Sequence, residues 1–158
     1  MAVARHRFGP QFIVRVAVDS ATEIKAGDAV FLDGDDAKPA GSEPWVTDLA
    51  TTQANFVNHF LGIAQADHPA GSGDVRDFPV DISPLSVYEL DCAAETHEIG
   101  DTLGMAKASG NALVADQVRK AAAAASCFRC VRRDPIAASR VYVRMQSAYW
   151  GINDATRQ

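Results

Sequence analysis

Short segments in which large apolar residues occupy every second position constrain this chain more than any other feature. In residues 11–18 the alternating positions hold Phe12, Val14, Val16 and Val18. Successive side chains of an extended chain point to opposite faces of a sheet, so this period of two predicts a β-strand. Similar alternation recurs in residues 78–82, 86–92 and 140–145. The sequence therefore predicts a mainly β fold, a compact β-barrel or sandwich.

One segment departs from the period of two. In residues 48–60, Leu49, Phe56, Val57 and Phe60 fall on one stripe at 3.6 residues per turn. Thr47 precedes the segment and is a residue type that caps helix N-termini. We therefore expect one inserted α-helix near 48–60, with Phe56, Val57 and Phe60 buried.

The length of 158 residues fits one domain. We expect an N-terminal arm over 1–10, a single β domain over 11–146 and a C-terminal tail over 147–158. Residues 33–44 and 68–77 are rich in Gly, Pro and Asp, which predicts loops. The alanine-rich run 118–125 has high helix propensity inside a β pattern, so helix and strand both remain open there.

The β domain contains a candidate internal repeat. Residues 23–32 and 98–105 each place a Gly-Asp turn before a short apolar strand. In both halves an insertion, a further strand, a loop and a final alternating strand follow. This order predicts two related β-motifs, over 22–83 and 96–146, with the helix inserted in the first.

Charge is distributed unevenly along the chain, whose net charge is −5. Residues 118–158 contain eight basic and two acidic residues, a net +6, which leaves −11 for the first 117 residues. Such a bipolar surface could orient the protein on a partner or on its own neighbours, although a solvated surface without a partner explains it equally well. The acidic overall balance argues against nucleic-acid binding by the basic segment.

No motif supports a catalytic or metal site. Cys127 and Cys130 have the spacing of a zinc or redox pair, but structural zinc needs four ligands, and only Cys92 and four dispersed histidines remain. The acidic run 33–36 lacks the other ligands of a calcium loop, and no Gly-x-Ser-x-Gly nucleophile is present. We therefore expect a protein that is not an enzyme, with no cofactor, no metal and no disulfide.

Two wider interpretations concern location and an alternative function. No stretch approaches the roughly 18 apolar residues of a membrane helix, so we expect no membrane contact and synthesis in a cytoplasm. The alternative to a structural role is a small β-barrel enzyme or ligand-binding domain with a pocket near His59, His97 and Cys92.

Several short motifs together resemble the decoration, or cement, proteins of tailed-phage capsids. They lie at 25–32, 60–65, 98–101 and 140–144, and include the Gly-Asp turns and the Gly-Ile-Ala strand. The resemblance covers residues 11–146. It implies a structural virion protein, made in the host cytoplasm, that binds the outside of the capsid and stabilises it. The implied partners are the major capsid protein and the chain itself, as a homotrimer.

The two ends of the chain contain the candidate contact residues. Arginine and aromatic residues dominate binding hot spots, and weak contacts repeated over a shell give firm attachment. We therefore predict capsid or subunit contacts at Arg5, Arg7, Phe8, Tyr149 and Trp150. The alternative is that Trp150 packs on its own core and the arm is frayed.

Overall fold

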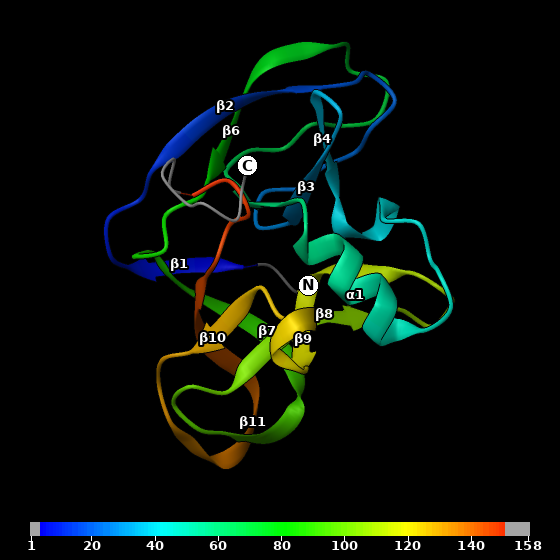
Figure 1. The fold of residues 1–158 in the computed structure, drawn as a ribbon. Coiled ribbons are helices and arrows are strands. Elements are labelled where there is room, and N and C mark those ends of the chain that lie inside the picture. Colours follow the sequence, from blue (N-terminus) through cyan, green and yellow to red (C-terminus); the bar gives the residue numbers. More distant parts are fainter. Residues whose placement is uncertain (1–3, 151–158) are drawn as a thin grey trace.

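The structure, a computed structural model, describes residues 4–150, without the side chains of 135–137. Residues 1–3 of the predicted arm and 151–158 of the predicted tail lie outside this range. The fold is mainly β with a single α-helix, α1 (Leu49–Val57), as predicted (Figure 1). The strands are β1 (Arg5–Phe8), β2 (Ile13–Val18), β3 (Ala29–Asp33), β4 (Asp36–Pro39), β5 (Phe60–Ala64), β6 (Val75–Asp81), β7 (Val87–His97), β8 (Thr102–Lys107), β9 (Leu113–Lys120), β10 (Phe128–Cys130) and β11 (Asp134–Met145). Short 3₁₀ helices, η1 (Ala40–Ser42) and η2 (Ala123–Ala125), follow β4 and β9.

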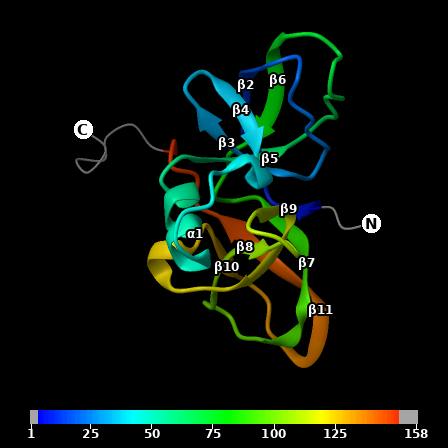
Figure 2. The same ribbon diagram turned by 90° about the vertical axis from the view of Figure 1, so that its right-hand side faces the viewer.

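The strands form two five-stranded closed barrels, which lie one above the other in the two views of Figure 1 and Figure 2. The first barrel has the order β2-β4-β3-β5-β6. In the second, pairing of β7 with β9 closes the order β7-β11-β10-β8-β9, and β1 is added outside β7. Within residues 4–150, no helix has the length and apolar character needed to cross a bilayer.

The two barrels have the same topology. In each, the first and third strands pair in parallel, and the other four pairings are antiparallel. The matched segments, 13–81 and 87–145, each begin one strand before the predicted repeat units. Duplication of the sequence itself stays a prediction.

Equivalent Gly-Asp turns precede β3 and β8. Gly27 and Gly100 have φ of 94° and 95°, a region that favours glycine. The carboxylates of Asp28 and Asp101 accept the backbone N–H three residues earlier, at 3.0 and 2.9 Å. Each turn therefore closes in the same way at the same place in its barrel.

The barrels share a wall. Val30 and Leu61 point into the first barrel, whereas Phe31, Phe60 and Ile63 belong to a second apolar cluster that includes Leu90 and the interior of the second barrel. Strands β3 and β5 are thus buried on both faces, which explains why all five residues of β5 are buried. The first barrel has its own apolar core around Val30 and Leu61, and the outer faces of β3 and β5 join the core of the second barrel.

The chain ends cross between the barrels. β1 precedes the first barrel in sequence but pairs with β7 of the second, with Arg5 opposite Glu89. After β11, the backbone N–H of Ala148 donates to Phe60 O at 2.9 Å, so the C-terminal segment lies on the first barrel. The predicted N-terminal arm is therefore partly a strand of the sheet.

Helix α1 is shorter than predicted, and a different residue caps it. The carboxylate of Asp48, not the hydroxyl of Thr47, accepts the N–H of Thr51 at 2.8 Å. Phe56 and Phe60 are buried, but Val57 is half-buried, and Phe60 already begins β5. The helix ends early because Phe60 pairs with Phe31 of β3.

Two predicted loops contain regular structure. Residues 36–39 form β4 and residues 40–42 form η1, inside the predicted loop 33–44. The strand forms despite its Asp and Pro content because it pairs with both β3 and β2. Residues 75–77, in the second predicted loop, begin β6, and the alanine-rich run 118–125 is the end of β9 followed by η2 rather than an α-helix.

Candidate functional site

Exposed apolar side chains gather where the two barrels meet. The link from β1 to β2, the link from β6 to β7 and the segment after β11 lie together on the left of Figure 1. These segments and the strand ends next to them include exposed large apolar residues: Phe8, Phe12, Ile13, Leu85, Tyr149 and Trp150. We call these six residues the waist patch. Phe8 and Phe12 are 57% and 52% exposed, which is unusual for phenylalanine in a folded domain.

Specific contacts bring the three segments together. The rings of Phe12 and Trp150 meet edge to face with centroids 5.4 Å apart. The hydroxyl of Ser86 donates to Pro10 O at 3.1 Å. Gly9 has φ of 90°, and a Cβ there would lie 2.0 Å from Leu85 O, so only glycine fits. The patch therefore has a defined shape.

The fully buried carboxylate of Asp81 lies beneath the waist patch and holds its segments by hydrogen bonds. Oδ1 of Asp81 accepts the backbone N–H groups of Phe12 and Ser83, each at 3.0 Å. Oδ2 accepts the hydroxyls of Ser86 and Tyr88, each at 2.7 Å. Asp81 thus ties both waist links to the first barrel, and the four bonds offset the cost of burying the carboxylate.

Tyr88 extends this network to the second barrel. Its hydroxyl also accepts the side-chain amides of Gln65 at 2.9 Å and Gln11 at 3.2 Å. Burial, and then the hydrogen bond to Asp81, raise the pKa of Tyr88 well above its ordinary value. The hydroxyl therefore stays neutral and acts as a joint between the barrels.

A group of arginines adjoins the waist patch. Arg129 on β10, Arg132 in the link that follows, and Arg140 and Arg144 on β11 are exposed and lie around Tyr142. We call these four residues with Tyr142 the arginine face. The guanidinium of Arg132 lies 4.8 Å from the centroid of the Tyr142 ring, and the centroids of the Phe8 and Tyr142 rings are 6.4 Å apart. Phe8 therefore joins the two surfaces.

Arg5 and Arg7, which were predicted as contact residues, make ion pairs within the chain. Arg5 bonds Glu89 at 2.7 Å and Asp91 at 2.9 Å, and Arg7 bonds Glu89 at 2.9 Å. Burial favours the neutral form of Glu89, but the pairs with Arg5 and Arg7 outweigh it and hold the pKa of Glu89 below its usual value. These arginines fix β1 on β7.

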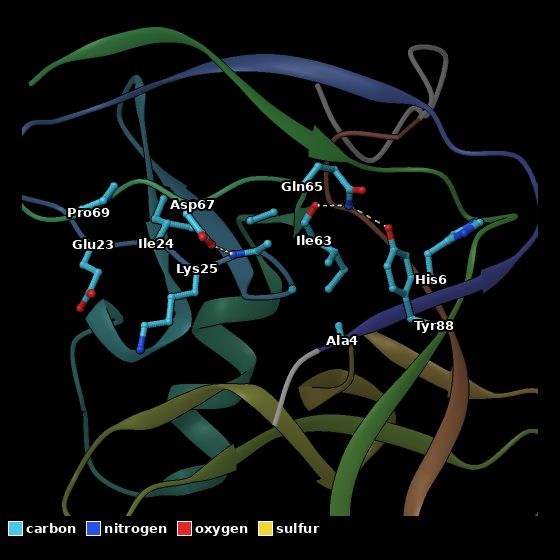
Figure 3. A pocket seen from close by; sticks show the side chains of 13 residues that line it. Ala4, His6, Glu23, Ile24, Lys25, Ile63, Gln65, Asp67, Pro69 and Tyr88 are labelled. Carbon is cyan, nitrogen blue, oxygen red and sulfur yellow. Dashed lines mark hydrogen bonds between the residues drawn. The ribbon is translucent and has the colours of Figure 1, made fainter. Parts of the chain in front are cut away.

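A cavity of about 580 Å³ lies between the first barrel, β1 and β7 (Figure 3). Ile24 and Ile63 contribute apolar surface, and Tyr88 and His6 stand at one end. Lys25, Glu23 and Asp67 carry charges at the opposite end. The amide of Ala26 already donates to Asp67 at 2.8 Å, so that carboxylate serves the turn before β3.

The alternative pocket near His59, His97 and Cys92 does not coincide with this cavity, whose described lining includes none of the three. His59 stacks on Phe31 and contacts Glu43. His97 is fully buried near Glu95 at the end of β7, and the Cys92 thiol donates to Ala138 O. Among residues 4–150, no three His, Cys, Asp or Glu side chains are placed to hold a metal ion.

The three cysteines are buried free thiols. Burial raises the pKa of the Cys92 thiol to about 11, and it raises the pKa of Cys127 and Cys130 as well. A thiol that stays protonated is a poor nucleophile and a poor metal ligand. Neither thiol of the Cys-x-x-Cys pair is therefore activated by its surroundings.

The waist patch contains three of the five predicted contact residues. Phe8, Tyr149 and Trp150 belong to it, while Arg5 and Arg7 lie beside it in ion pairs. Phe12 was not predicted as a contact because its alternation with Val14 suggested a barrel wall, but β2 begins at Ile13. Leu85 lies between the predicted strands 78–82 and 86–92 and gave no signal in the sequence.

Comparison with known proteins gives no family for this chain. No protein-family model matches it, and no curated protein is similar to it in sequence.

Proposed function

We propose that this chain is a structural virion protein that binds the outer surface of a tailed-phage capsid and stabilises it, without catalysing a reaction. The waist patch supports this proposal. It places six large apolar side chains on the surface, beside a rim of arginines. Clustered exposed apolar side chains next to arginines are typical of protein interaction sites. The choice of a capsid as partner follows from the resemblance to decoration proteins.

The geometry of the patch suits a rigid docking surface. Its segments are short links between strands, fixed by Gly9 and by the four hydrogen bonds to Asp81. A rigid patch loses little conformational entropy on binding. On an icosahedral shell, many such contacts act together, so a modest affinity per copy is sufficient. We propose the major capsid protein as the partner and a homotrimer as the bound form.

The proposal is tested by sedimenting the protein with expanded, empty capsids of the phage that encodes it. We expect Phe8→Ala and Trp150→Ala each to weaken binding by about tenfold or more, because each removes about 1.4 kcal/mol or more of hot-spot contact. Single substitutions are preferable to deletion of residues 1–9, because β1 is part of the sheet.

The matched control is Ile99→Ala. Ile99 is 70% exposed but lies in the turn between β7 and β8, outside the waist patch. Binding by this variant should equal that of the wild type, and all variants should keep the wild-type circular dichroism spectrum. Equal binding by all variants, or a wild type that never sediments with capsids, contradicts the proposal.

A further inference from the structure

Two residues of the arginine face repel each other across neighbouring strands. Arg129 and Arg144 are directly opposite each other on β10 and β11. Like charges in such cross-strand pairs are destabilising. Arg140 lies 3.6 Å from Asp91, but Arg144 bonds only a backbone oxygen, that of Pro84, among the described residues. The face therefore retains an excess of guanidinium groups that a partner with carboxylates would offset.

The opposite charge is concentrated on the first barrel. Residues 13–81 contain twelve acidic and four basic residues, a net charge of −8. A hollow of about 430 Å³ lies between the end of β2, the β3–β4 turn and the start of β6. Its lining includes Asp19, Asp35, Asp36 and Asp74, together with Arg76. We call these four aspartates and Arg76 the acidic hollow.

The acidic hollow also contains a pair of like charges. Asp33, at its edge, is directly opposite Asp36 on the β3–β4 hairpin, and Lys38 pairs with Asp33 at 2.6 Å. Asp19 and Asp35 are exposed. With Arg76 as the one basic residue in the described lining, the hollow has a net charge of −3. Both charged surfaces thus contain uncompensated charge of opposite sign.

One copy of the chain cannot bring the two surfaces together. The elements of the acidic hollow lie at the upper end of the molecule in Figure 1, and β10 and β11 lie in its lower half. We propose that copies of this chain associate head to tail, with the arginine face of one copy against the acidic hollow of the next. Such a contact uses two different surfaces, so it can close into a ring.

A protein partner with carboxylates fits the arginine face better than nucleic acid does. Glu89 and Asp91 lie in the same sheet face, opposite Tyr142 and Arg140. Both carboxylates are already paired with arginines of this chain, so the face stays positive and the aspartates of the acidic hollow can approach its four arginines individually. The net charge of −5 on the whole chain disfavours binding of a phosphate backbone. The contact between copies does not require the capsid, so it can be measured without capsids.

Charge reversal of each surface tests the proposal. One variant carries Arg129→Glu with Arg144→Glu, and the other carries Asp19→Lys with Asp35→Lys. These residues are all exposed, so the fold should tolerate the changes. The matched control, Arg119→Glu with Lys120→Glu, reverses two exposed charges on β9. Mass is measured by sedimentation equilibrium over a range of protein concentrations at low and high salt.

We expect the wild type and the control to associate at low salt, with affinity at least about tenfold weaker at high salt. Each charge-reversed variant alone should associate at least about tenfold more weakly than the wild type. An equal mixture of the two variants should regain association, because the unchanged arginine face of one variant then meets the unchanged acidic hollow of the other.

Three results overturn the proposal. The wild type could remain monomeric at all concentrations, the reversed variants could associate like the wild type, or their mixture could fail to associate. A monomeric wild type that binds an oligonucleotide through Arg129 and Arg144 would assign the arginine face to nucleic acid instead. Capsid sedimentation of a monomeric wild type would leave the capsid role intact, so the two proposals fail separately.

Discussion

Substitution of Tyr88 by phenylalanine tests the joint between the barrels. The change removes one hydroxyl and keeps the ring, which lies in the shared apolar cluster. Oδ2 of Asp81 then keeps only its 2.7 Å bond to Ser86, and the amides of Gln65 and Gln11 lose an acceptor. The buried carboxylate cannot recruit water easily, because Asp81 has no exposed surface.

The expected loss of stability follows from the charge of the acceptor. A hydrogen bond to a charged group contributes about 1.5–3 kcal/mol, so we expect the free energy of unfolding to fall by about 2 kcal/mol. For a chain of this size that corresponds to a Tm lower by about 4–8 °C. The pKa of Tyr88 is raised in the folded state, so its contribution is present below the unfolded pKa, near 10, and is lost as pH rises above it. Tyr88→Phe has no hydroxyl to ionise, so its free energy of unfolding should not show this part of the decrease above pH 10.

Urea unfolding at neutral pH and at about pH 10.5 measures both effects. Tyr142→Phe is the control, because its hydroxyl makes no hydrogen bond recorded among the described residues and it lies outside the shared core. We expect that control to stay within about 0.5 kcal/mol of the wild type. If Tyr88→Phe is as stable as Tyr142→Phe, the joint does not contribute as argued.

Three further predictions concern separate parts of the fold. The arginines of β1 lower the pKa of Glu89, so these ion pairs stabilise the fold above the unfolded pKa of Glu89, and that stabilisation is lost as pH falls below about 4. Backbone amides of β1 should then lose hydrogen-exchange protection before those of β7. Simultaneous loss in both strands would contradict this prediction. The buried Cys127 thiol, whose pKa is raised, should react with a thiol reagent at pH 8 only as the protein unfolds, so rapid labelling of the native state would count against its burial. Asp48→Ala should cost about 1 kcal/mol through loss of the helix cap, while Thr47→Ala should be neutral in the same urea titration.

Local sequence patterns predicted the β class because alternation is a property of each strand. They did not locate the end of α1, since the spacing of Phe60 from Leu49 suits a helix equally well. Its place in β5 depends on pairing with Phe31, a contact between residues far apart in sequence. Strand β4 was not predicted for the same reason, because its pairing with β2 and β3, rather than its own residues, determines its conformation.

The candidate site was only partly accessible from sequence. Phe8 and Trp150 were predicted as contacts because aromatic residues near chain ends lack an obvious core. Nothing in the sequence indicated that Phe12 would join them, since exposure depends on where the barrel wall begins. The ion pairs of Arg5 with Glu89 and Asp91 also required the pairing of β1 with β7.

The crossing of the chain ends has a mechanical consequence. A pull on the N-terminus loads β1 against the second barrel, and a pull on the C-terminus loads the segment at Ala148 against the first. Each end is thus held by the barrel encoded at the other end of the chain. Force applied between the ends must break both attachments before either barrel can unfold. The molecule should therefore resist stretching as one mechanical unit rather than as two barrels that unfold one after the other.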